Sequence, residues 1–131
     1  MLTKITLPEG LTSLGNLVFR MSGLTEIVIP STVSLIGDSA FNFCEDLTRA
    51  VIMSGVTEIK SAVFASTDLK ELYIPKSVTV IGSYVIDELV DGLTVYYEGT
   101  ESERALISFG EDNGVIQNAK WEYSFSPDSL E

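Results

Sequence analysis

An internal repeat with a spacing of 22 to 24 residues constrains the fold of this chain more than any other feature. The repeat is marked by five leading leucines: Leu2, Leu24, Leu47, Leu69 and Leu93. Apolar residues recur 3, 5, 9, 12 and 17 positions after each of the first four leucines. A unit this short cannot bury its own apolar side, so several units must stack into a solenoid with one continuous core.

Each unit contains two stretches that predict extended backbone. In the second unit, Ile27 and Ile29 lie two residues apart, which places both side chains on one face of a strand. Pro30 follows directly, and a residue without an N–H group ends strand pairing. The apolar stretch over residues 33–36 predicts a second extended side, so the equivalent strands of successive units should pair in parallel.

A corner and a bulky residue complete each unit. Glycine occupies the corner in three units, as Gly15, Gly37 and Gly82, which predicts a positive φ or a close approach of two backbones. The following segment carries the bulky residue, Phe41 in the second unit, and predicts a short helical turn that fills the interior. The expected fold is a mainly β repeat solenoid, wound as a right-handed coil with short helical turns.

The repeat pattern gives way to a different segment near the C-terminus. Residues 100–103 read T-x-x-E, a capping box that predicts a short helix through Phe109, with Ala105, Leu106 and Phe109 over the open end of the core. Apolar and polar residues then alternate around Trp121, which predicts an amphipathic strand that seals the solenoid. We expect a C-terminal cap made of one helix and one strand.

These patterns predict one structural domain with two parts. The solenoid covers residues 1–99, with four full units and a partial fifth, and the capping segment covers residues 100–131. No capping segment precedes Leu2, so the first strand has an open edge, which natural proteins usually protect. We therefore expect an end-to-end contact at the uncapped N-terminal edge, either with further repeats of a longer array or with a partner.

Charge and composition exclude several classes of function. The chain has 8 basic and 19 acidic residues and a net charge of −11, which disfavours binding to nucleic acid. No apolar run is long enough to cross a membrane. The chain has no histidine and a single cysteine, Cys44, which removes His-based catalysis and Cys-rich metal sites. We expect no cofactor and no enzymatic activity, with a carboxylate-based hydrolase as a minor alternative.

A local acidic cluster is the one candidate for a metal site. Asp87, Glu88 and Asp91 lie close together in an irregular, longer repeat. They lack the ordered ligand spacing and the glycine of a calcium loop, so a solvated corner is the favoured interpretation and a calcium site the alternative.

Two columns of residues should point outward from the first strand of each unit. Two positions after the leucine the column places opposite charges side by side: Lys4, Glu26, Arg49, Glu71 and then Val95. Four positions after the leucine the column becomes apolar and aromatic towards the C-terminus: Thr6, Val28, Val51, Tyr73 and Tyr97. We take this second column as a candidate binding strip, although the strand propensity of such residues is the favoured explanation of the column.

The unit from Leu24 to Leu47 closely resembles the BspA-type leucine-rich repeat, including Ala40, Phe41 and Cys44 at their positions. The other units depart from it at the cysteine column, and the fourth has Ile86 in place of phenylalanine. The resemblance extends over residues 2–99. It implies cell-surface or secreted proteins of bacteria and some protists, for which adhesion or binding of host proteins has been proposed, and it implies no catalytic residue.

The leading hypothesis is therefore a non-catalytic binding module of a bacterial cell-surface or secreted protein, acting in adhesion or in binding of a protein or glycan. A passive structural spacer within a longer repeat array is the alternative. The two differ in whether the stacked strand surface has a ligand.

Overall fold

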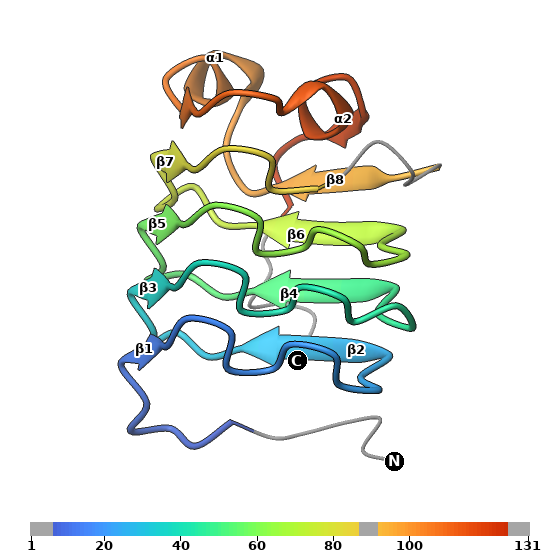
Figure 1. Ribbon diagram of the computed structural model, residues 1–131. Coiled ribbons are helices and arrows are strands. Elements are labelled where there is room, and N and C mark those ends of the chain that lie inside the picture. Colours follow the sequence, from blue (N-terminus) through green and yellow to red (C-terminus); the bar gives the residue numbers. More distant parts are fainter. Residues whose placement is uncertain (1–6, 87–91, 126–131) are drawn as a thin grey trace.

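In the computed structural model, which describes residues 7–86 and 92–125, the chain winds as a coil with two parallel sheets on its sides (Figure 1). The short sheet contains β1 (Ser13–Leu14), β3 (Leu35–Ile36), β5 (Glu58–Ile59), β7 (Val80–Ile81) and β9 (Ser108–Phe109) in this order. The long sheet contains β2 (Glu26–Ile29), β4 (Arg49–Ile52), β6 (Glu71–Ile74), β8 (Thr94–Tyr97) and β10 (Lys120–Glu122), with β2 at one edge and β10 at the other. The predicted mainly β solenoid is confirmed.

The inward columns of the long sheet form the core, as the strand periodicity predicts. One such column runs across four neighbouring strands in the order Ile27, Ala50, Leu72 and Val95. Each of these residues is at most 1% exposed. The long-sheet strands of the second and fourth units end immediately before Pro30 and Pro75. Proline has no N–H group to donate to the neighbouring strand. One continuous apolar core runs from the first coil to the cap.

The corner glycines permit a close approach of successive coils. A Cβ on Gly37 would lie 2.5 Å from Asn16 Oδ1, and one on Gly82 would lie 2.6 Å from the backbone nitrogen of Ser61. The close approach was one of the two expected explanations. The other, a positive φ, is wrong for these glycines, because the described glycines with positive φ are Gly55 and Gly92.

The segment with the bulky residues forms consecutive turns, and the prediction of a short helical turn there is wrong. Leu17, Ser39, Ala62 and Tyr84 occupy the same repeat position, and all have φ between 53° and 61°. This left-handed conformation is unfavourable for residues with a Cβ. Here each coil compensates by donating N–H groups to the next coil, as from Phe41 to the Val63 carbonyl at 3.0 Å. A helix would keep these hydrogen bonds within one coil.

Side chains add two further ladders along the axis. The rings of Phe19, Phe41 and Phe64 stack inside the core with centroids 5.4 Å and 5.6 Å apart. At the corner, one polar side chain per coil accepts a hydrogen bond from the backbone N–H of the next coil, through Asn16, Asp38, Ser61 and Ser83. These hydrogen bonds are 2.9–3.0 Å long and fix the stacking register of successive coils.

The cap begins with the predicted capping box and then departs from the prediction. The Thr100 hydroxyl accepts from the Glu103 N–H at 3.2 Å, and the Glu103 carboxylate accepts from the Thr100 N–H at 3.0 Å. However, α1 spans only Glu101–Arg104. Residues 108–109 instead form β9 and extend the short sheet at the edge of β7, where the Ser108 N–H donates to the Thr79 carbonyl and the Gly110 N–H donates to the Ile81 carbonyl, both at 2.8 Å. Leu106 is 79% exposed, so its predicted position over the core is wrong, and Ile107 is the buried residue.

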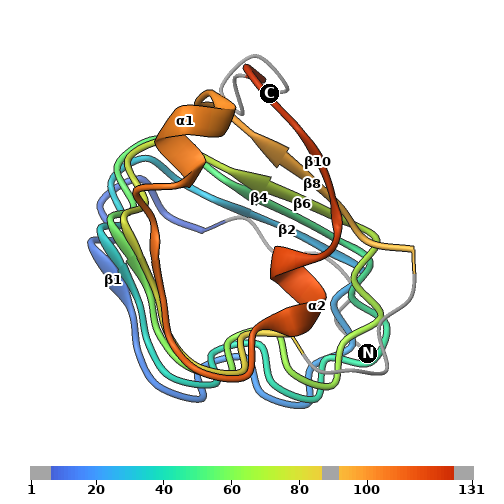
Figure 2. The same cartoon turned by 90° about the horizontal axis from the view of Figure 1, so that it is seen from above.

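The remaining cap residues close the end of the solenoid (Figure 2). A second short helix, α2 (Gly114–Gln117), precedes β10. Trp121 lies in the core, as predicted, and its indole N–H donates to the Ile116 carbonyl at 2.8 Å. The Arg104 guanidinium lies 4.0 Å from the centre of the indole ring and donates to the Gln117 carbonyl at 2.6 Å, so it ties α1 to both α2 and β10.

Candidate functional site

The outer face of the long sheet is the surface that the sequence proposed as a binding site. Two rows of side chains point outward from it, as the strand register shows. The polar row contains Glu26, Arg49, Glu71, Thr94 and Lys120. The apolar row contains Val28, Val51, Tyr73 and Tyr96, and ends at Glu122. We call these two rows together the outer face.

The structure places three of the five proposed strip residues in one row. Val28 lies beside Val51, and Val51 lies beside Tyr73. Thr6 lies outside the described residues. The prediction for Tyr97 is wrong, because Tyr97 pairs with Ile74 of the inward column and is only 1% exposed. Tyr96 lies beside Tyr73 on the outer face instead.

The error at Tyr97 comes from the longer spacing of the last unit. Leu93 follows Leu69 by 24 residues, but the register pairs Leu72 with Val95, an interval of 23. Counting from Leu93 therefore displaces the strand by one residue, and a one-residue shift moves every side chain to the opposite face. The same shift makes Val95 a core residue, so Thr94 takes its predicted place in the polar row.

The outer face is unevenly accessible. Val51 and Tyr73, in the middle of the apolar row, are only 1% and 7% exposed. Val28 and Tyr96 are half-buried, and the nearby Phe125 is 40% exposed. The accessible aromatic surface therefore lies at the C-terminal end of the face, around Tyr96 and Phe125.

Phe125 reaches this face because the backbone leaves the strand pattern. The alternation from Ala119 to Phe125 predicts that Phe125 points inward. Instead, Ser124 has a φ of 65° and the Phe125 N–H donates to the Tyr97 carbonyl at 3.1 Å. The Phe125 ring then contacts Tyr96 edge to face, with centroids 5.0 Å apart. Serine gives no strong signal for a left-handed residue, so the sequence did not reveal this contact.

The polar row is a confirmed charge ladder over three strands. Arg49 lies between two carboxylates, with Nε 3.4 Å from Glu71 and a terminal nitrogen 4.0 Å from Glu26. All three side chains are about one-third exposed, so solvent weakens these ion pairs to at most about 1 kcal/mol each. The ladder favours one register of the strands, and the Glu71 side chain remains 41% exposed at its end.

The aromatic rings of the outer face stand on edge. The Tyr73 and Tyr96 rings stack with centroids 4.5 Å apart and an angle of 13° between planes. The Arg49 guanidinium lies 5.3 Å from the centre of the Tyr73 ring and makes a cation–π contact with it. We call Tyr73, Tyr96 and Phe125 the aromatic cluster.

Burial raises the pKa of Tyr73 on the outer face and of Tyr97 in the core above the usual 10.0. Desolvation raises the pKa of Tyr73, and the Glu71 charge raises it further, while a hydrogen bond from Arg49 opposes the shift. Desolvation also raises the pKa of Tyr97, with added contributions from Glu103 and Glu98. Their hydroxyl groups therefore act as neutral hydrogen-bonding groups and not as bases.

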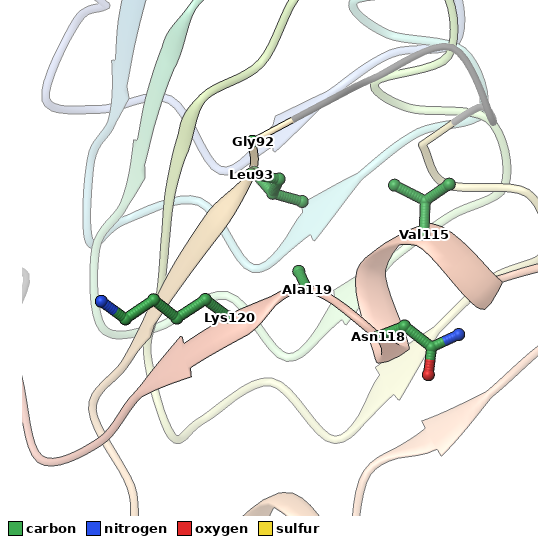
Figure 3. Close-up of a pocket in the computed structure, with 6 residues that line it drawn as sticks. All are labelled: Gly92, Leu93, Val115, Asn118, Ala119 and Lys120. Carbon is green, nitrogen blue, oxygen red and sulfur yellow. The ribbon is translucent and has the colours of Figure 1, made fainter.

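A shallow depression of about 270 Å³ lies between the start of β8 and α2 (Figure 3). Its lining residues are Gly92, Leu93, Val115, Asn118, Ala119 and Lys120. Among these six described residues Lys120 is the one charged side chain, and none of the six is a carboxylate.

Metal-binding and membrane-spanning features are absent from the described part of the chain. Residues 7–86 and 92–125 contain no group of three or more acidic, histidine or cysteine residues that could hold a metal ion. The acidic cluster Asp87, Glu88 and Asp91 lies outside these residues. None of the described helices is long and apolar enough to span a membrane.

Comparisons with known proteins agree with this fold. The family model "BspA type Leucine rich repeat region (6 copies)" matches residues 1–89. The crystal structure of the pneumococcal vaccine antigen PcpA is 30% identical over 71% of this chain and 23% of its own length, with a TM-score of 0.57. A leucine-rich repeat protein from Bacteroides ovatus is 20% identical over 83% of this chain and 33% of its own, with a TM-score of 0.61. Among curated proteins no significant match is found.

The stacked coils and parallel sheets define a leucine-rich repeat solenoid, a class of protein that is generally non-enzymatic and binds through its surface. The chain belongs to the BspA-type leucine-rich repeat family, and the sequence resemblance is confirmed. It spans about a quarter to a third of the length of the two similar structures.

Proposed function

We propose that this chain is a protein-binding module of a bacterial cell-surface or secreted protein, acting in adhesion or attachment to another protein. The family and the similarity to a pneumococcal vaccine antigen support a surface location. The aromatic cluster at the end of the outer face is the observation that carries the proposal, because exposed aromatic residues beside charged ones are typical of protein interfaces.

The ring geometry favours a protein over a glycan. Sugars stack on a flat, open ring face, but the Tyr73 and Tyr96 rings cover each other and Arg49 lies over Tyr73. The ring edges and the Phe125 side chain remain available, and they suit apolar side chains of a protein. The partly exposed Glu71 carboxylate beside them favours a basic partner surface.

The test uses a panel of purified host extracellular proteins and a glycan array as probes. Tyr96→Ala and Phe125→Ala should each weaken protein binding by about tenfold or more, as expected for interface aromatic residues. Tyr84→Ala is the matched control, because Tyr84 is 43% exposed but lies in the consecutive turns between the short and the long sheet, which we call the turn side. Binding to glycans only, or equal loss in all three variants, would refute the proposed site.

A passive spacer within a repeat array is the second candidate, and the ladders favour it. Hydrogen bonds at the corner join each coil to the next from Asn16 to Glu111, which gives a rigid stack suited to holding other domains apart. The spacer predicts that no member of either panel binds. Binding that depends on Tyr96 would exclude it.

A further inference from the structure

Asn113 is a polar side chain buried where the cap meets the fourth coil, which contains β6 and β7. It directly precedes α2, which lies across the end of the solenoid (Figure 2), and it is only 2% exposed. Its side-chain oxygen accepts from the Val85 N–H at 3.0 Å, and its side-chain nitrogen donates to the carbonyls of Gly82 and Gly110 at 2.8 Å and 3.0 Å. One carboxamide therefore joins the fourth coil to the segment between β9 and α2.

This set of contacts requires a carboxamide. An amide has donors on its nitrogen and an acceptor on its oxygen, and Asn113 uses both ends. An ionised aspartate has acceptors only, so one of its oxygens would face the Gly82 and Gly110 carbonyls where the nitrogen now donates. Replacing the side-chain nitrogen with oxygen would turn a stabilising contact into repulsion and bury a charge.

The residue after Asn113 makes this side chain chemically labile. The chain has four asparagines, and glycine follows only Asn113. Because glycine has no side chain to hinder its backbone nitrogen, the Gly114 nitrogen can attack the carbonyl carbon of the Asn113 side chain. The new C–N bond closes a five-membered imide ring, the bond to the side-chain nitrogen breaks, and ammonia leaves with the proton of the Gly114 N–H. Water then opens the imide at either carbonyl and leaves aspartate or isoaspartate.

The closed cap opposes this reaction. The imide forms only if the side-chain nitrogen leaves, and that nitrogen donates two of the three buried hydrogen bonds of Asn113. Breaking them in place would leave the Gly82 and Gly110 carbonyls buried without these donors, which is unfavourable. The reaction should therefore proceed from a cap that has opened locally.

We propose that Asn113–Gly114 is a deamidation site that the closed cap protects, and that its conversion to aspartate or isoaspartate loosens the cap irreversibly. β9 keeps its own backbone hydrogen bonds to the fourth coil, as from the Ser108 N–H to the Thr79 carbonyl. The loss falls on α2, whose Ile116 carbonyl accepts from the Trp121 indole. The modified chain keeps its coils and exposes the Trp121 end of the core. This modification does not depend on what the outer face binds.

The test follows deamidation of the purified chain at neutral pH by peptide mass spectrometry, in buffer and in concentrated urea. In urea, Asn113 should be modified well before the three other asparagines. In buffer the same site should react about a hundredfold more slowly, because several buried hydrogen bonds must break together before the cap opens. Equal rates in buffer and urea would overturn the protection, and an unreactive Asn113 in urea would overturn the site itself.

Two variants separate the chemistry from the opening of the cap. Gly114→Ala is the matched control, since an added Cβ would meet only the Asn118 side-chain amide, at 3.9 Å, and Gly114 does not have a positive φ. It keeps the cap but hinders the attacking nitrogen, so it should react about tenfold more slowly in urea. Arg104→Ala leaves the reacting dipeptide intact but removes the hydrogen bond from α1 to the Gln117 carbonyl.

Arg104→Ala should therefore speed deamidation in buffer by about 5–30-fold, through a larger population of the opened cap, and leave the rate in urea unchanged. A wild-type rate for this variant in buffer would overturn the link between the reaction and cap opening.

The effect on the cap is read from Trp121, the one tryptophan of the chain. During incubation at neutral pH, quenching of its fluorescence by acrylamide should increase in the wild type in step with the modified fraction, and stay constant in Gly114→Ala. Asn113→Asp, prepared directly, should show the same increase and a folding equilibrium constant about tenfold lower or less. Modified wild type with an unchanged Trp121 signal would overturn the proposed loosening, whether or not Asn113→Asp folds.

Discussion

The corner glycines give the sharpest test of how the coils pack, because one substitution has opposite consequences at two positions of the same repeat column. In Gly82→Ala, the added Cβ would lie 2.6 Å from the Ser61 nitrogen and 2.8 Å from the Lys60 carbonyl carbon. Both are backbone atoms, so two coils must move apart by several tenths of an ångström. Overpacking of this kind costs about 1–3 kcal/mol.

In Gly15→Ala, the added Cβ meets nothing within 4 Å, and Gly15 does not have a positive φ. The substitution restricts the unfolded chain without straining the folded one, so it should stabilise the protein by about 0.4–1 kcal/mol. The two variants should therefore differ by about 1.4–4 kcal/mol in free energy of unfolding, when the two ranges are combined.

Urea unfolding followed by Trp121 fluorescence measures both variants, since the chain has one tryptophan and it lies in the core. The m-value should stay unchanged, which shows that each variant unfolds as one unit. Equal stability of the two variants would refute the close-approach explanation, because they share the chemistry of the change and differ only in what lies opposite.

Three further predictions concern the cap and its titrating groups. Arg104→Ala should destabilise the protein by about 1–2 kcal/mol, because it removes a cation–π contact and a hydrogen bond, whereas the exposed Lys120→Ala should change the urea midpoint little. The Thr100 backbone N–H lowers the pKa of Glu103 below its usual 4.5. Its contribution is therefore present above this value and lost as pH falls through the folded pKa, so Glu103→Gln should flatten the acid limb of a stability–pH curve. Burial raises the pKa of Tyr97 above its usual 10.0, so its contribution is present below pH 10.0 and lost as pH rises through the folded value. Tyr97→Phe should be less sensitive than wild type in alkaline unfolding followed by circular dichroism.

The repeat makes most of the fold readable from the sequence. A column such as Ile27, Ala50 and Leu72 shows the same apolar character several times, so the inward face and the parallel register follow without ambiguity. The charge ladder through Arg49 was predicted for the same reason. The turn side was harder, because Leu17 and Ser39 share a left-handed backbone that neither residue type favours. Hydrogen bonds to the neighbouring coil impose that conformation. The sequence of a single unit does not reveal them, because their partners lie in another unit.

The candidate site lies where this periodicity ends, and that explains why the sequence predicted it only in part. Val28 and Val51 were placed correctly because their strands repeat, but periodic residues become covered in a stack, and Val51 is 1% exposed. Accessible aromatic surface requires a departure from the repeat. It arises from the shifted register that turns Tyr96 outward and from the left-handed Ser124 that brings Phe125 beside it. Both events depend on the contacts of the final strands, so recognition surfaces in such a solenoid are best sought at its irregular end.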